Sequence, residues 1–98
     1  MEEDYKQFYG LISLRQVEAV DEILEKQKLN VNKKDKYGFY PVRIAATRCD
    51  LEMLQLLVKY GAKKSLSKKD YFGRNLLDLS HHCQNQKLTA YIQQELTK

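Results

Sequence analysis

The sequence predicts an all-α fold, a short solenoid in which pairs of helices repeat along the chain. An internal repeat is the first sign: Asp35-Lys36-Tyr37-Gly38 returns 35 positions later as Asp70-Tyr71-Phe72-Gly73, and each block precedes an apolar stretch. Helical spacing of apolar residues is the second, and it is clearest over residues 51–58. One proline and four glycines are too few for a turn-dense all-β fold. A chain of 98 residues is expected to form a single domain, 1–98.

The first unit of the repeat, about residues 3–34, has the weakest pattern. Its second helix is expected at 17–24, which has the same apolar character as the later segment 51–58. An extended or hairpin-like loop over residues 29–36 then leads into the first of the two repeated blocks.

The second unit, residues 35–69, carries the clearest helix signals. Its first helix is expected over 40–46, because Pro41 suits the first helical position, where a missing N–H costs nothing. Its second helix is expected over 51–60. Gly61 follows as a C-terminal cap, since glycine accepts the left-handed conformation.

The third unit, residues 70–98, begins with a loop over about 64–72 and the second repeated block. Asn75 is a good N-cap for a helix that continues to Ser80. A final helix is expected over 87–96. Gly38 and Gly73 are expected at turn positions that need positive φ.

The expected core combines the apolar positions of all three units. Its members are Phe8, Leu11, Ile12, Val17, Val20, Ile23, Leu24, Val42, Ala45, Ala46, Leu54, Leu57, Leu76, Leu79, Leu88 and Ile92.

With these segments placed, the chain resembles the ankyrin repeat family, most clearly in residues 35–69. The resemblance rests on Asp35-x-x-Gly38-x-Tyr40-Pro41-Val42-Arg43-Ile44-Ala45-Ala46, then on Glu52-Met53-Leu54-Gln55-Leu56-Leu57-Val58, and on Gly61-Ala62. The third unit keeps Asp70, Gly73 and Leu77-Asp78-Leu79-Ser80 but lacks the proline and the paired alanines. The resemblance implies an ankyrin-type solenoid of about three repeats.

The chain departs from the family pattern at several positions. Tyr40 and Arg43 stand where the family usually has threonine and histidine. The glycine usual between the two helices of a repeat is replaced by Arg15, Cys49 and Gln84. The loop that follows Gly61 is two residues longer than the usual spacing. Degenerate end repeats are expected, because terminal units need a polar outer face.

Charge is distributed unevenly along the chain. Residues 1–25 carry seven acidic and two basic residues, whereas residues 26–74 carry thirteen basic and four acidic ones. Residues 75–98 are balanced. The middle of the chain therefore presents a positive field that attracts acidic proteins, nucleic acids or anionic membranes.

Composition argues for an intracellular protein of ordinary globular type. The longest purely apolar runs have two or three residues, far short of a membrane span. Met1-Glu2-Glu3-Asp4 is the opposite of a secretory signal. Two cysteines do not make a disulfide framework, so a cytoplasmic, reducing compartment is expected.

Cys49, His81, His82 and Cys83 raise the question of a metal site or a disulfide. The cysteines are expected in similar places on neighbouring helices about 8–10 Å apart, too far for a disulfide, which needs Cα atoms within about 7 Å. A metal shared between the two repeats is not excluded, but the sequence favours no metal, no cofactor and no catalytic site. No phosphate loop, nucleophile elbow or dinucleotide fingerprint is present.

Exposed aromatic and basic residues are the expected means of recognition. The resemblance implies that residues around each Asp-x-x-Gly turn project as fingertips and that the first helix of each repeat lines a concave face. Aromatic residues and arginine dominate binding hot spots. The expected partner-binding residues are Lys36, Tyr37, Phe39, Arg48, Lys69, Tyr71, Phe72 and Arg74. Tyr40 and Phe72 have an alternative role in packing within their own loops.

The expected function is a small protein-binding module that masks or regulates one partner with an acidic surface, with no enzymatic activity and no membrane partner. A nucleic-acid adaptor that uses the lysine-rich loops is the first alternative. A self-associating repeat unit and a piece of a longer repeat array are the others. The polar residues Gln84, Asn85, Gln86, Gln93, Gln94 and Glu95 favour a finished C-terminal cap.

Overall fold

The computed structural model describes residues 2–70 and 72–98 of the chain. Their α-helices are α1 (Glu2–Ser13), α2 (Val17–Lys26), α3 (Pro41–Thr47), α4 (Leu51–Lys59), α5 (Leu76–Ser80) and α6 (Gln86–Leu96). Two short 3-10 helices, η1 (Ala62–Ser65) and η2 (His81–Cys83), follow α4 and α5. No strand is present within these described ranges, which confirms the predicted all-α fold.

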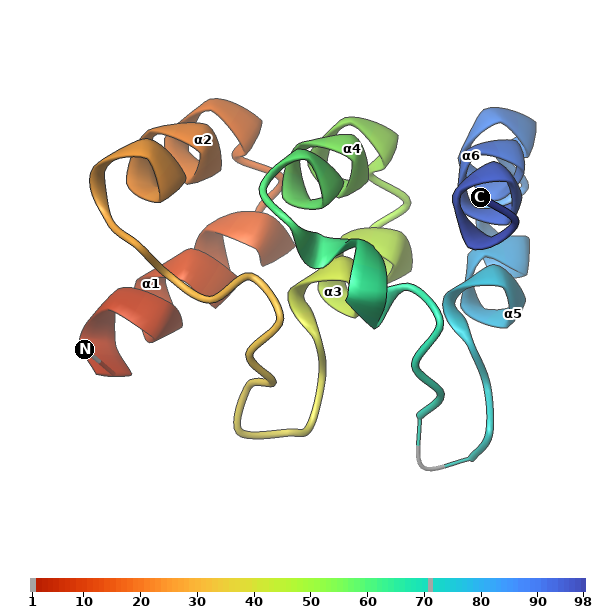
Figure 1. The fold of residues 1–98 in the computed structure, drawn as a ribbon, viewed down its shortest axis with the longest axis horizontal. Coiled ribbons are helices and arrows are strands. Elements are labelled where there is room, and N and C mark those ends of the chain that lie inside the picture. The colour runs from red at the N-terminus through yellow and green to blue at the C-terminus, as the bar shows by residue number, and fades with distance from the viewer. Residues whose placement is uncertain (1, 71) are drawn as a thin grey trace.

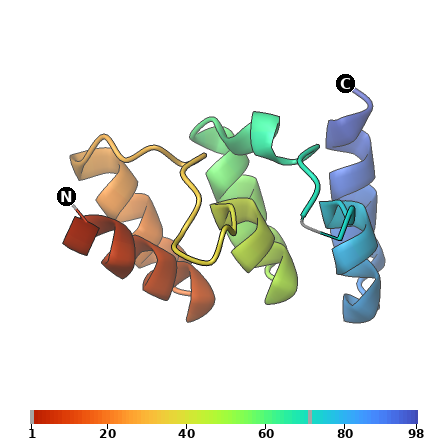
Figure 2. The ribbon, with the colours of Figure 1, turned by 90° about the horizontal axis from the view of Figure 1, so that it is seen from below.

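The helices form two layers. Figure 1 shows α1, α3 and α5 in one layer and α2, α4 and α6 in the other, with the long loops projecting from the α1–α3–α5 side. Seen from that side, the pairs follow one another in a row in chain order (Figure 2). This stacking is the solenoid that the repeat predicts.

The core is one cluster that runs through all three helix pairs. Phe8 and Ile12 of α1, Leu54 and Leu57 of α4, and Ile92 of α6 are fully buried. Twelve of the sixteen expected core residues are buried, and the other four, Leu11, Val17, Ile23 and Leu79, are half-buried against the same cluster. The helical spacing in the sequence therefore identified the buried face of the helices.

Helix ends follow the capping signals of the sequence. Pro41 begins α3, and the side chain of Tyr40 before it makes no cap hydrogen bond. Asn75 and Asp78 form a reciprocal capping box at the start of α5. The Asn85 side chain accepts a hydrogen bond from the Leu88 amide at the start of α6.

Three residues between paired helices adopt the left-handed conformation without being glycine. They are Arg15 (φ 62°), Cys49 (φ 57°) and Gln84 (φ 51°). These are the positions at which the sequence comparison with the ankyrin pattern placed the family's glycine. The backbone confirms that equivalence, because each of these residues turns the chain from the first helix of a pair towards the second.

Tyrosines of α1 fix the loop between α2 and α3. The Tyr5 hydroxyl accepts a hydrogen bond from the Asn30 amide at 2.8 Å. The Tyr9 hydroxyl donates to the carbonyls of Lys33 and Lys34 at 2.8 and 3.1 Å. Burial, with a smaller contribution from the charge of Asp35, raises the pKa of Tyr9 to about 12, so this hydroxyl keeps its donated proton at neutral pH.

Among the described helices, none combines the length and the apolarity that crossing a membrane requires.

Candidate functional site

Two loops, the first finger (residues 35–39) and the second finger (residues 70–74), are built on the same frame. The Asp35 carboxylate accepts hydrogen bonds from the amides of Tyr37 and Phe39, both at 2.9 Å. The amide of Asp35 donates to the Phe39 carbonyl at 2.9 Å, and Gly38 turns the chain with φ 82°. The aspartate side chain therefore fixes the finger by accepting hydrogen bonds from backbone amides, which strand pairing would satisfy in a longer hairpin.

The second finger repeats this arrangement 35 residues later. The Asp70 carboxylate accepts from the amides of Phe72 and Arg74 at 2.9 and 2.8 Å. The Asp70 amide donates to the Arg74 carbonyl at 2.8 Å, and Gly73 has φ 79°. Both glycines adopt the predicted positive φ. Tyr71, one of the predicted partner-binding residues, lies outside the described residues.

The fingers hold aromatic side chains in solvent. Tyr37 is 69% exposed, Phe72 is 76% exposed and Phe39 is 36% exposed. The rings of Tyr37 and Phe39 pack together with their centroids 6.2 Å apart. When a partner covers exposed aromatic rings that a fixed loop holds in place, their burial contributes strongly to the free energy of binding.

An arginine of α3 connects the two fingers. Arg43 lies over the ring of Phe39, 4.3 Å from its centroid, and donates to the Asp70 carboxylate at 2.9 Å. Arg74 donates to the same carboxylate at 3.0 Å and lies 5.2 Å from the ring centroid of Phe72. One carboxylate therefore orients two arginines, each against the aromatic ring of a different finger.

The ionisation of Asp70 reflects this arrangement. Burial alone would raise its pKa, but hydrogen bonds from the Arg74 amide, the two guanidinium groups and the Phe72 amide outweigh burial and lower the pKa of Asp70 to about 2. The carboxylate is thus charged at any physiological pH and keeps the frame of the second finger intact.

We expect Asp70→Asn to lower the midpoint of thermal unfolding by a few degrees at pH 7. The pKa of Asp70 is lower in the folded chain than its ordinary value of 3.8, so its stabilising contribution is complete above about pH 4. That contribution is lost as the pH falls towards 2. Melting curves of both proteins between pH 7 and pH 2 should therefore converge at the acidic end. Glu25→Gln, at an exposed position of α2, is the control, and a constant gap between Asp70→Asn and the parent chain at every pH would contradict the assignment.

A groove of about 530 Å³ lies between the two fingers and α3. Its lining includes the apolar residues Val42, Leu76 and Leu79 and five basic residues, which are Lys34, Arg43, Lys68, Lys69 and Arg74. Asp70 is the one carboxylate among the described lining residues, and Arg43 and Arg74 already pair with it. The groove therefore combines the exposed rings of Tyr37, Phe39 and Phe72 with an excess of positive charge.

A second hollow of about 570 Å³ lies on the other side of the first finger, against α1. Four lysines and two carboxylates line it, together with the tyrosines that fix the loop between α2 and α3; the charged residues are Lys6, Lys33, Lys34, Lys36, Glu3 and Asp35. Tyr37 borders both hollows, so the tip of the first finger stands between two basic surfaces.

Most of the predicted partner-binding residues that the structure describes lie around the two fingers. Tyr37, Phe39, Lys69, Phe72 and Arg74 line the groove between the fingers, and Lys36 lines the hollow beside it. Arg48 lies apart from them, because it caps the far end of α3 and donates to the Ser13 hydroxyl at 3.1 Å. The sequence prediction left out Arg43, Lys34 and Lys68. Arg43 had a signal, since it stands where the family usually has histidine.

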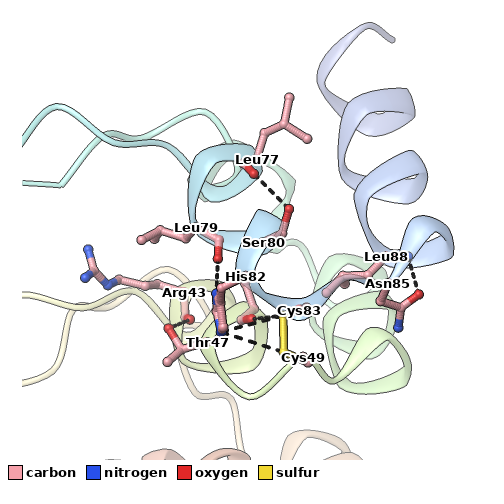
Figure 3. Close-up of a disulfide and its surroundings, with 11 residues drawn as sticks. Arg43, Thr47, Cys49, Leu77, Leu79, Ser80, His82, Cys83, Asn85 and Leu88 are labelled. Atoms are coloured by element: carbon pink, nitrogen blue, oxygen red, sulfur yellow. Dashed lines mark hydrogen bonds between the residues drawn. A yellow bond between two sulfur atoms is a disulfide. The ribbon is translucent and has the colours of Figure 1, made fainter.

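The structure overturns the expectation that Cys49 and Cys83 are too far apart to bond. The two form a disulfide with their Cα atoms 5.6 Å apart (Figure 3). The expectation was wrong because Cys49 lies in the turn after α3 rather than on a helix, and because its equivalent in the third unit is Gln84, not Cys83. Cys49 lies in the turn after α3 and Cys83 lies at the end of η2, and these neighbouring segments bring the two Cα atoms to within disulfide distance.

The 3-10 helix η2 also brings a histidine to the disulfide. Nε2 of His82 lies 3.8 Å from the sulfur of Cys49 and 3.8 Å from that of Cys83. The three residues form a group whose ligand atoms lie within 4.8 Å of one another. His81 is not part of it.

Comparison with known proteins agrees with this architecture. The family model described as ankyrin repeats, many copies, matches residues 11–58, which include the first finger and helices α2 and α3. No curated protein sequence matches the chain. Ankyrin repeats generally mediate protein–protein interaction and are typically not enzymes. The matched segment, the stacked helix pairs and the projecting fingers together show that the chain belongs to the ankyrin repeat family.

Proposed function

We propose that the chain is a protein-binding module that holds an acidic segment of one partner protein in the groove between its fingers. The observation that carries this is the combination of exposed aromatic rings with five basic side chains on one groove. Lysines attract an acidic partner and set the rate of encounter, while aromatic rings and arginines supply most of the affinity.

The frame of the fingers lowers the conformational entropy that the chain must lose when it binds a partner. Asp35 and Asp70 hold the backbone of each tip by hydrogen bonds that exist without a partner. Arg43 and Arg74 are already oriented by Asp70. A surface that is organised before binding loses less conformational entropy when it binds.

The finer parts of this proposal come from the sequence. The module masks or regulates its partner, and its three repeats span about 3–34, 35–69 and 70–98. It has no catalytic role. A cytoplasmic location stays a prediction, and the disulfide removes the low cysteine content as an argument for a reducing compartment.

The first experiment is a pull-down from native lysate with the purified chain as bait, with and without nuclease, read by mass spectrometry. An acidic protein that is retained after nuclease treatment supports the proposal and names the partner. Recovery that disappears with nuclease and falls steeply with salt would instead show a nucleic-acid adaptor. A concentration-dependent increase in mass on size-exclusion chromatography, without a partner, would favour self-association.

With the partner in hand, we expect the double variant Tyr37→Ala and Phe72→Ala to weaken binding at least about tenfold. Both side chains are mostly exposed, so the free chain should keep its thermal stability. Calorimetric titration measures the affinity. Leu14→Ala, at a position 68% exposed and outside both hollows, is the matched control. Equal affinity for the double variant and the control would exclude the fingers as the binding surface.

Charge reversal tests separately whether the lysines attract an acidic partner and speed its association. Lys34→Glu with Lys68→Glu and Lys69→Glu should slow association several-fold at low salt, and the difference should shrink as salt is added. Lys87→Glu on α6, which lines neither hollow, should leave the association rate unchanged.

A further inference from the structure

The disulfide, together with His82, has the composition of a metal site. Cys49 contributes its sulfur from the turn between α3 and α4, Cys83 contributes its sulfur from η2, and His82 contributes a ring nitrogen from η2 (Figure 3). Thiolate and imidazole are the ligands that zinc prefers in proteins. Three ligand atoms from two repeats converge within 4.8 Å.

The ring of His82 is oriented as a ligand would be. Its Nδ1 lies within hydrogen-bonding distance of the Leu79 carbonyl, which can only accept, so Nδ1 carries the proton. In the neutral ring, Nε2 then has a free lone pair, and Nε2 is the atom that faces both sulfurs. A histidine ligand held through a hydrogen bond from its other nitrogen to a carbonyl is the usual arrangement in metal sites.

We infer that the reduced chain binds one Zn²⁺ through Cys49, His82 and Cys83, with the fourth position open to water. Bonds of about 2.3 Å to sulfur and about 2.0 Å to nitrogen place tetrahedral S and N ligands roughly 3.5 Å apart. Nε2 already lies 3.8 Å from each sulfur. Only the two sulfurs must separate, to roughly 3.8 Å, and rotation of one cysteine side chain supplies this.

Conversion of the disulfide to two zinc-bound thiolates is balanced when a dithiol is the reductant. The dithiol gives two electrons and two protons to the Cys49–Cys83 bond and itself becomes a cyclic disulfide. Each freed thiol then loses its proton to solvent as its sulfur binds zinc. Two thiolates neutralise the charge of the ion, so the site needs no acidic neighbour.

Zinc would thereby keep the turn after α3 joined to η2 when the covalent bond is gone. The second and third helix pairs are linked through these turns in the oxidised chain. The inference rests on this cluster alone and does not depend on the fingers or on their partner.

The test uses the full chain, reduced with a phosphine under anaerobic conditions and titrated with Zn²⁺ against a chromophoric chelator. We expect one ion per chain, a dissociation constant below about 1 µM and release of two protons near neutral pH. Co²⁺ in place of Zn²⁺ should give thiolate-to-metal charge-transfer absorption. The absence of stoichiometric binding, or of thiolate charge transfer, would overturn the inference.

The neighbouring histidine offers a matched control. His82→Gln should weaken Zn²⁺ binding at least about tenfold, whereas His81→Gln should leave it unchanged. The double variant Cys49→Ser and Cys83→Ser should bind no ion. Equal affinities of the two histidine variants would overturn the assignment of His82.

Circular dichroism tests the inference even if the chain unfolds when its disulfide is reduced. If reduction unfolds the chain, stoichiometric Zn²⁺ should restore the helical signal of the parent chain and of His81→Gln, but not of the double serine variant. Failure of Zn²⁺ to restore that signal would count against the site.

Discussion

Leu57→Ala is expected to lower the free energy of unfolding by about 3 kcal/mol. Leu57 lies on α4, is fully buried and belongs to the cluster that joins the helix pairs. Truncation removes apolar contacts and leaves a cavity that stacked helices cannot fill. Domains of this size have a total stability of about 5–15 kcal/mol, so the loss is a large share of it.

Chemical denaturation followed by circular dichroism measures this effect. The midpoint should fall while the slope with denaturant stays constant, because the surface exposed on unfolding hardly changes. Leu14→Ala is the control, since this leucine is 68% exposed, and its effect should stay within about 0.5 kcal/mol. A loss for Leu57→Ala no larger than that of the control would show that α4 does not pack as described.

Opening the Cys49–Cys83 bond is expected to cost about 4 kcal/mol of stability. The two cysteines are 34 residues apart, and the bond restricts the unfolded chain by closing that loop. The third helix pair should be affected most, because the bond holds η2 to the turn after α3. Under oxidising conditions, Cys49→Ser with Cys83→Ser should unfold at much lower denaturant concentration than the parent chain.

Reduction of the parent chain separates the effect of the disulfide on stability from the effect of replacing the two cysteines by serine. In a phosphine reductant with a chelator present, the parent chain and the double serine variant should have free energies of unfolding within about 1 kcal/mol of each other. If the variant matches the oxidised parent chain instead, the bond contributes nothing to stability.

Features set by a few neighbouring residues could be predicted from the sequence. The start of α3 at Pro41, the capping of α5 by Asn75 and the positive φ of Gly38 and Gly73 each depend on a local backbone preference. The two Asp-x-x-Gly blocks also predicted fingers of equal shape, because their hydrogen bonds all lie within five residues.

Core residues outside regular helices could not be identified in the same way. Leu66 is fully buried, but it lies in a lysine-rich stretch just beyond η1 and shows no helical spacing. Val31 is buried in the loop that the tyrosines of α1 fix. Their burial depends on tertiary contacts rather than on periodicity.

Contacts between units depend on register, which the sequence does not show. Arg43 and Asp70 are 27 residues apart, and their ion pair needs the second finger to lie beside the start of α3. The disulfide was missed for the same reason, since Cys83 lies one residue before Gln84, the position equivalent to Cys49, and is therefore the last residue of η2. Basic residues were recognised as a group, but the groove that gathers them was not.

The frame shared by the two fingers separates the residues that shape each loop from those that face outward. An aspartate, a glycine and backbone amides determine the path of the chain, whereas the side chains at Lys36, Tyr37 and Phe72 take no part in those frame hydrogen bonds. Natural variation can therefore replace the outward residues and change specificity while the scaffold is preserved. Recognition residues from another protein can therefore be grafted onto the outward positions, because the aspartate, the glycine and the backbone amides still determine the shape of the loop.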